Sequence, residues 1–286
     1  MVAAVPSVRG LWSFAREREK IRLRRAAGEP PPWTKDDVLA RFRFCNVRRA
    51  DDAGTQWYLD TVAESQETEE ELLWSTVFYR LVNNPAWFDV VGFPSLASWK
   101  KRRPHWETKI RNGPKVYSPA YLTFGGASKG YSGRMPHSEK LILSLRYSAI
   151  YGRFTGLSTH LSLEGFWKWL QEIPHVGPFI ATQVYRDLFL ARALRQFDED
   201  SFVYLGPGAR SGLALLGAVT SYDAQLALCE KIWKRQLEGP WGERLLLADV
   251  QSLLCEARKY WNIRAWLNGK RSRPKLRYYK NGVARV

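Results

Sequence analysis

The sequence has 286 residues, of which 45% are hydrophobic and 25% charged, and this composition excludes wholesale disorder. An excess of 44 Lys+Arg over 28 Asp+Glu gives a net charge of +16, which points to a polyanionic partner such as nucleic acid. No apolar run approaches the roughly 20 residues of a membrane span, and the three cysteines lie too far apart for a disulfide framework or a local metal site. We therefore expect a reduced cytoplasmic protein with no membrane partner, no metal and no cofactor.

The basic residues are concentrated in three blocks along the chain. Residues 1–50 carry 12 basic and 5 acidic groups, residues 101–153 carry 11 and 2, and residues 251–286 carry 10 and 1. A fold that gathers these blocks has a positive face suited to a phosphate backbone. Prolines 30–32 stop a helix-compatible run at 14–27, so we expect residues 1–37 to be a basic arm, either solvated or in contact with phosphates. Residues 268–286 are expected to be a basic C-terminal tail.

Apolar residues recur at helical spacing through residues 38–267, which we expect to form one helical domain. Strand-like alternation is scarce, so the predicted fold class is mainly α. Residues 111–137 are rich in Gly, Pro, Ser and Tyr, and they predict a long loop or a small β-hairpin. Helices are predicted at residues 67–91, 95–101, 138–151, 162–173, 179–194, 221–236 and 243–266.

The most specific local pattern is IPHVGPFIA at residues 173–181, between two predicted helices. It resembles the turn of helix-hairpin-helix proteins, whose usual form is Leu-Pro-Gly-Val-Gly-x-x-x-Ala. Such a turn directs backbone N–H groups and the positive end of the second helix at a DNA phosphate, here from His175, Val176 and Gly177. His175 replaces the usual first glycine and removes a permissive backbone position. The alternative is an ordinary turn between two helices.

Helix-hairpin-helix DNA glycosylases carry a catalytic aspartate beyond this turn, in a window that here contains Asp198, Glu199 and Asp200. Glycosylases that also cleave the DNA strand have a lysine just after the second glycine of the turn. Phe179 occupies that position, so we expect no Schiff-base lyase chemistry. The four-cysteine iron–sulfur cluster of many such enzymes is absent from the sequence as well.

Two longer motifs sharpen this resemblance. One is FRFCNVRRADD at residues 42–52, continued by Thr55-Gln56-Trp57, and the other joins residues 177–188 to residues 206–213. Across residues 41–237 the chain resembles the alpha-glutamyl/putrescinyl thymine pyrophosphorylase family, phage amino acid:DNA transferases with a helix-hairpin-helix glycosylase-like fold. Some members are fused to a P-loop kinase, but this sequence contains no Gly-x-x-x-x-Gly-Lys-Ser/Thr, so we expect the kinase step to lie elsewhere.

The resemblance implies hypermodification of thymine in phage DNA. An amino acid or polyamine would displace pyrophosphate from pyrophosphorylated 5-hydroxymethyluracil in double-stranded DNA, with the base flipped out of the helix. A carboxylate must accept the proton of the incoming ammonium, and the candidates are Asp200, Asp187 and, third, Asp52. The other matched positions are assigned to the leaving pyrophosphate (Arg48, Arg49, Arg210), to the substrate base (Asn46, Gln56, Gln183) and to a DNA phosphate (Gly206, Gly208).

Each assignment has a structural alternative. Arg49 and Asp52 suit a surface pair on one helix, and Asp187 suits a cap or salt bridge of the second hairpin helix. The remaining alternatives are backbone hydrogen bonds for Asn46 and Gln56, a tight connection at residues 206–208, and a core position for Trp57, Trp167 and Trp169 in place of stacking on a flipped base. Two other functions stay open: a monofunctional DNA glycosylase that uses Asp200, and a non-catalytic DNA-binding protein.

Overall fold

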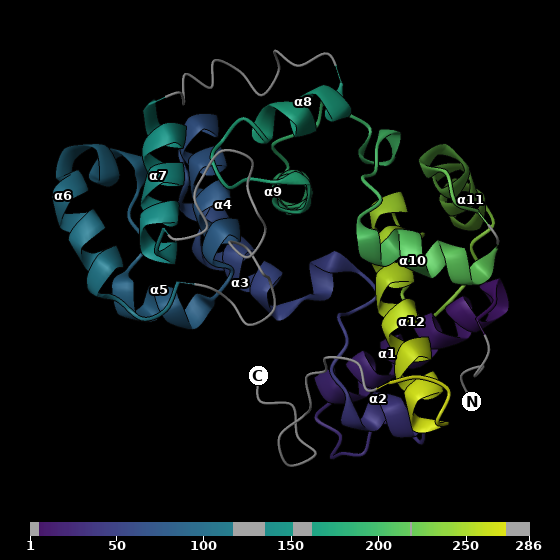
Figure 1. Cartoon of the computed structure of the whole chain (residues 1–286). Helices are drawn as coiled ribbons and strands as arrows, with labels where there is room; N and C mark the ends of the chain where they lie inside the picture. The colour runs from purple at the N-terminus through teal and green to yellow at the C-terminus, as the bar shows by residue number, and fades with distance from the viewer. Residues whose placement is uncertain (1–5, 117–134, 151–161, 218, 273–286) are drawn as a thin grey trace. The chain divides into compact units, whose positions relative to one another are not determined.

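Figure 1 shows the computed structural model, which describes residues 6–116, 135–150, 162–217 and 219–272. Every regular element in these ranges is an α-helix or a short 3-10 helix, so the mainly α prediction is confirmed. The chain divides into two compact units: unit 1 comprises Met1–Asp52 and Leu205–Val286, and unit 2 comprises Ala53–Tyr204. The predicted loop or hairpin at 111–137 lies mostly outside the described residues, as do residues 273–286 of the predicted tail.

Unit 1 is built around one long C-terminal helix. Its elements are α1 (Val8–Ala26), α2 (Asp37–Arg41), η1 (Arg49–Asp51), α10 (Pro207–Leu216), α11 (Tyr222–Lys234) and α12 (Leu247–Leu267). Helix α12 contacts α1, α2, α10 and α11, and it is therefore the centre of the unit. Hydrophobic burial against this helix joins chain segments that are more than 150 residues apart in sequence.

The first helix differs from the expected basic arm. Leu11, Trp12, Phe14 and Ile21 are buried on α1, and the Phe14 ring lies 5.4 Å from the ring of Tyr260 on α12. Most arginines and lysines of α1 lie outside this buried face, whereas Arg18 is buried and donates to the carbonyl of Phe44 at 2.9 Å, so the helix belongs to the core of unit 1. The structure thus includes residues 8–26 in a folded unit, whereas the basic charge of the segment favoured an arm.

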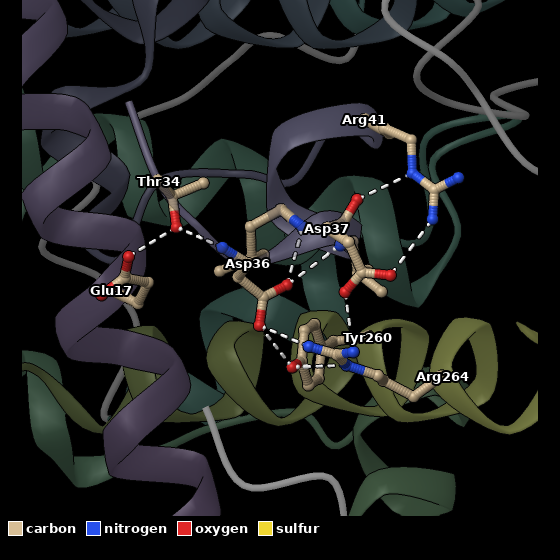
Figure 2. A network of polar contacts seen from close by, with 9 residues as sticks. Glu17, Thr34, Asp36, Asp37, Arg41, Tyr260 and Arg264 are labelled. Carbon is tan, nitrogen blue, oxygen red and sulfur yellow. Dashed lines mark hydrogen bonds and ion pairs between the residues drawn. The ribbon is translucent and has the colours of Figure 1, made fainter. Parts of the chain in front are cut away.

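A buried polar network fixes the short helix α2 to α12 (Figure 2). One carboxylate oxygen of Asp36 caps α2 by accepting hydrogen bonds from the amides of Val38 and Leu39, each at 3.0 Å. The other oxygen accepts from the Tyr260 hydroxyl and from the Arg264 guanidinium, both at 2.8 Å. Because Asp36 is almost fully buried, these partners replace the water that its charge would otherwise require.

Two glycines let α10 cross α12 at close range. A Cβ atom on Gly208 would lie 2.3 Å from the Sγ atom of Cys255, and one on Gly212 would lie 2.4 Å from the carbonyl oxygen of Leu254. No side chain fits at either position, so the spacing of the two glycines on one face of α10 serves helix packing.

Unit 2 has an aromatic-rich core around α4. Its elements are α3 (Ala53–Thr61), η2 (Ala63–Ser65), α4 (Glu69–Val82), α5 (Pro85–Val91), α6 (Leu96–Asn112), α7 (His137–Ile150), α8 (Leu163–Leu170), α9 (Pro178–Leu190) and η4 (Glu199–Ser201). Helix α4 contacts α6, α7 and α9 (Figure 1), and it is buried from Leu73 to Val82. The ring of Phe78, for example, contacts the rings of Trp74, Trp87 and Phe88. This rigid core carries the α8–α9 hairpin.

Candidate nucleic-acid interface

The segment around the predicted turn forms α8, a turn and α9, an arrangement that suits both a helix-hairpin-helix motif and an ordinary turn between two helices. Ile173 and Val176 are buried, and the amide of Val176 donates to the carbonyl of Ile173 at 3.0 Å, which closes the turn. His175, which replaces the usual glycine, has φ of +66°. That is the left-handed region in which glycine is normally favoured, so the turn keeps its backbone path despite the substitution.

The N-terminus of α9 is left open at Gly177. This residue is the N-cap of α9, and no side chain caps the helix there. A Cβ atom on Gly177 would meet no atom within 4 Å, so the turn borders open space at this point. The first amides of any helix have no partner within the helix, and an uncapped, accessible N-terminus is a suitable site for an anion such as a phosphate.

Helix α7 supports the turn from behind. The Ser144 hydroxyl donates to the carbonyl of Pro174 at 2.6 Å. Burial and the nearby positive charge of Lys140 both lower the pKa of His175. The same two causes lower the pKa of His137 at the start of α7, so Lys140 lies electrostatically close to both imidazoles. At neutral pH, His175 of the turn is therefore mostly uncharged, with the positive charge of Lys140 nearby.

Asp187 lies on α9 in the core of unit 2. Its carboxylate accepts a pair of hydrogen bonds from the guanidinium of Arg80 on α4, one of them at 2.7 Å from Nη2, and both side chains are buried. Arg80 also donates to Asn83 at 2.6 Å and to Thr55 at 3.3 Å. This is the salt-bridge alternative for Asp187. An arginine within the apolar run of α4 was the available signal for a buried anionic partner.

Asp200 lies at the surface of the same unit, in η4. The carboxylate of Asp198 accepts a hydrogen bond from the Asp200 amide at 3.0 Å and so caps this short helix, while Asp200 itself is half-exposed. Just beyond η4, the rings of Phe202 and Tyr204 each lie 5.2 Å from the ring of Trp167 on α8. These contacts hold the segment after Asp200 against the first hairpin helix.

The other candidates of unit 2 are two glutamines and three tryptophans. Gln183 is buried on α9, whereas Gln56 is exposed on α3. The Trp167 indole donates to Pro178 and Thr182, each at 3.1 Å, which fixes it to the hairpin. Trp57 stacks on the rings of both Tyr79 and Phe88, and Trp169 stacks on Phe166.

In unit 1, the motif at residues 42–52 is a polar segment. The side-chain amide of Asn46 donates to the carbonyl of Asp51 at 2.7 Å. The backbone amide of Asn46 donates to the Asp52 carboxylate at 3.2 Å. The Arg49 amide donates to Asp249 at 3.1 Å, and the Arg49 guanidinium lies 4.0 Å from Asp52. Sequence reasoning missed Asp249, which is buried 200 residues away on α12 and fixes this segment in place.

The remaining candidates of unit 1 have local partners. Arg48 donates to the carbonyl of Trp241 at 3.0 Å and pairs with Glu243 at 3.2 Å. Arg210 donates to Gln225 at 2.7 Å and lies over the ring of Tyr222.

Gly206 is the N-cap of α10, whereas the missing side chain of Gly208 is required by the contact with Cys255. Gly208 therefore has a packing reason for being glycine, in addition to any contact with DNA.

The predicted residues fall into two sets. Unit 2 contains Gln56, His175, Val176, Gly177, Gln183, Asp187 and Asp200, and unit 1 contains Asn46, Arg48, Arg49, Asp52, Gly206, Gly208 and Arg210. Within unit 2, α9 carries both the open turn and the buried pair of Asp187, so the phosphate-binding candidate is joined directly to the core.

Comparison with known proteins gives the family. Residues 5–267 match the family model described as "5-hmdU DNA kinase, helical domain", so the chain belongs to this family. A "5-hmdU DNA kinase" of Bacillus phage SP10 is 26% identical over 306 residues. The match covers 94% of this chain but 48% of the relative, so the chain spans about half the length of that protein.

No solved structure is significantly similar to the chain. None of the helices in the described ranges is long and apolar enough to span a bilayer. The family match confirms the broader part of the sequence resemblance, because the family's description names 5-hmdU, a modified thymine nucleoside, in DNA. The amine-transfer activity stays a prediction.

Proposed function

Because the chain belongs to this family, we propose that it acts on a 5-hydroxymethyluracil derivative in duplex DNA and transfers an amine to it. The observation that carries the DNA part of the proposal is the α8–α9 turn, whose helix terminus is uncapped and borders open space at Gly177. We propose this turn as a helix-hairpin-helix contact with a backbone phosphate. The net charge of +16 supports the same partner.

In the proposed reaction, pyrophosphate leaves the exocyclic carbon of the base and an amine takes its place. The carbon–oxygen bond breaks, and its electron pair departs with the pyrophosphate. The nitrogen of an amino acid or polyamine forms the new bond to carbon, and the ammonium proton passes to a carboxylate. Arginines keep their charge at any working pH, and the residues that we propose for the leaving group in unit 1 are Arg49 and Arg210, considered by themselves.

Asp200 is our proposed proton acceptor. It is half-exposed and follows the DNA-binding turn, whereas Asp187 is fully buried and already bound by Arg80. A carboxylate that must reach an incoming amine needs access from solvent, and of these two only Asp200 has it. Asp187 is better suited to holding α9 and its turn in place. Asp52, the third candidate, accepts a hydrogen bond from Asn46 in unit 1.

A second candidate function is recognition of the modified base without group transfer. The family description, a helical domain of a kinase, favours it, as does the relative's roughly twofold greater length. In that case the chain would present the base to phosphorylation chemistry carried by other residues, since these 286 residues contain no P-loop motif.

One experiment separates the two candidates. DNA carrying pyrophosphorylated 5-hydroxymethyluracil is incubated with the protein and a panel of amino acids and polyamines, then digested to nucleosides for mass spectrometry. A new nucleoside that carries the amine supports the transferase. Binding to this DNA with unchanged nucleosides supports the recognition function, and release of a free base indicates glycosylase chemistry.

A further inference from the structure

Helix α6 has a strongly basic surface that the proposed function does not use. Between Lys100 and Lys115 the sequence has seven basic residues and a single acidic one, Glu107. Most of these cations are exposed to solvent: Lys100, Lys101, Arg102, Arg103, Arg111 and Lys115. The one half-buried cation, Lys109, lies 4.8 Å from the centre of the Trp106 ring.

The only carboxylate of this helix segment is already neutralised. Glu107 is buried, and it accepts a hydrogen bond from Arg146 of α7 at 2.6 Å. Arg103 and Arg111 also lie within 3.6 Å of it. These hydrogen bonds and charges lower the pKa of Glu107, with the bond from Arg146 the largest cause, so it stays ionised.

Lys101 and Arg102 are two adjacent exposed cations of α6. Lys100 pairs with Glu70 at 2.9 Å, and Arg103 lies beside Glu107. Within the described part of the chain, no carboxylate forms an ion pair with Lys101 or Arg102. Two adjacent unneutralised charges on an exposed surface raise the local potential and attract a polyanion.

The bend of α6 presents these two residues in a defined conformation. Arg102 has non-helical angles of φ −120° and ψ 30°, and Pro104 follows in the helix interior, where it removes a backbone donor. The Trp106 indole donates to the Ser98 hydroxyl at 3.1 Å and thus bridges the bend. One side-chain hydrogen bond, from Trp106 on one side of Arg102 to Ser98 on the other, therefore spans the bend.

Helix α7 connects this surface to the hairpin turn. On one side, Arg111 of α6 pairs with Glu139 of α7 at 2.6 Å, and Arg146 of α7 binds Glu107. On the other side, Ser144 of α7 binds the carbonyl of Pro174 in the turn. Figure 1 shows α6 beside α7 within unit 2. The basic surface and the turn thus belong to one packed body.

We propose that the surface of α6 centred on Lys101 and Arg102 is a second contact for the phosphate backbone of the DNA. This inference rests on the proposed function, because it takes the same duplex as the partner. The exposed cations Lys100, Lys101, Arg102 and Arg103 follow one another around the bend, a concentration of positive charge suited to phosphates of one strand. The contact is independent of base sequence because it involves phosphates alone.

The test uses the full chain with Lys101→Ala and Arg102→Ala combined. Affinity for a fluorescent duplex is measured over a range of salt concentrations. Loss of two phosphate contacts should make the slope of log K against log salt less steep by about 1.8. For proteins that bind equally at about 1 M salt, this difference in slope corresponds to roughly 60-fold weaker binding of the variant at about 0.1 M salt. The matched control combines Lys231→Ala near the end of α11 and Arg235→Ala at its C-cap, both exposed sites, with the same change in net charge, and its slope should equal that of the wild type.

Two results would overturn the proposal: an unchanged slope in the α6 variant, or equal losses in the α6 and α11 variants, which would reflect net charge alone. The outcome for the proposed function is read separately. If the wild-type protein fails to bind duplex DNA, the function itself fails. If the wild type binds and Gly177→Asp abolishes binding while the α6 variant does not change, only the second contact is wrong.

Discussion

A substitution at Gly177 tests the phosphate-binding turn without disturbing the fold. The glycine has φ of −82° and ψ of 179°, an extended conformation open to any residue, and its Cβ position meets nothing within 4 Å. Gly177→Asp therefore fits sterically. Because Gly177 is the uncapped N-cap of α9, aspartate there should cap the helix and raise its stability by a few tenths of a kcal/mol.

The same aspartate should weaken DNA binding for two reasons. Its carboxylate occupies the first amides of α9, and its charge repels a phosphate at about 4 Å by roughly 1 kcal/mol in water and about 4 kcal/mol near a protein surface. We expect binding to weaken by at least about tenfold. Gly177→Asn caps the helix without the charge and should lose less, and Gly177→Ala should bind almost like the wild type.

Fluorescence anisotropy gives the affinities of this series, and thermal unfolding gives its stabilities. Affinity should fall in the order Ala, Asn, Asp, whereas the melting temperature should be lowest for Ala and higher for Asn and Asp, which cap the helix. A folded Gly177→Asp protein that binds DNA as tightly as the wild type would refute the turn as a phosphate site. Parallel losses of affinity and stability would show that the glycine matters only to the fold.

Three further predictions follow from unit 2. Asp200→Asn should lower amine-transfer turnover by roughly 100-fold with DNA affinity unchanged, and full activity in single-turnover assays would remove Asp200 as the proton acceptor. Arg80→Met should lower the free energy of unfolding by about 3 to 5 kcal/mol because it removes the cation that pairs with the buried Asp187 carboxylate, and adding Asp187→Leu should recover much of this loss in denaturant titrations. Burial and Lys140 lower the pKa of His175, so its contribution to stability is full above pH 6.5 and declines as the pH falls below that value. A bound phosphate would favour the protonated form, so DNA affinity should rise as the pH falls through the lowered pKa of His175, and His175→Asn should remove that rise.

Local sequence signals predicted most helices of the protein. Ser95, Ser162 and Ser221 were placed at or next to helix starts, and each is an N-cap whose side chain accepts an amide hydrogen bond. Helix α6 was predicted to end near residue 101, but it continues through Pro104 to Asn112 because the bend at Arg102 absorbs the proline. Helices α3 and α10 were missed, since both are short and contain glycine.

Long-range contacts were the part that sequence patterns could not supply. The pairing of Asp187 with Arg80 spans 107 residues, and that of Arg49 with Asp249 spans 200. Neither partner follows from helical periodicity, because a period describes one helix and not its neighbour. The glycine spacing in α10 was interpreted as a phosphate turn, whereas the packing of Gly208 against Cys255 depends on a helix far along the chain.

The most direct test of the account is the balance between pyrophosphate release and amine incorporation. Duplex DNA containing pyrophosphorylated 5-hydroxymethyluracil is mixed with an excess of the protein and a nitrogen-15-labelled amine. Released pyrophosphate and labelled nucleoside are then quantified from the same reaction. The account predicts equal amounts of both, formed only when protein and amine are present together, and neither product with Asp200→Asn on the same timescale. Pyrophosphate release without labelled nucleoside, or no release from DNA that the protein demonstrably binds, would contradict it.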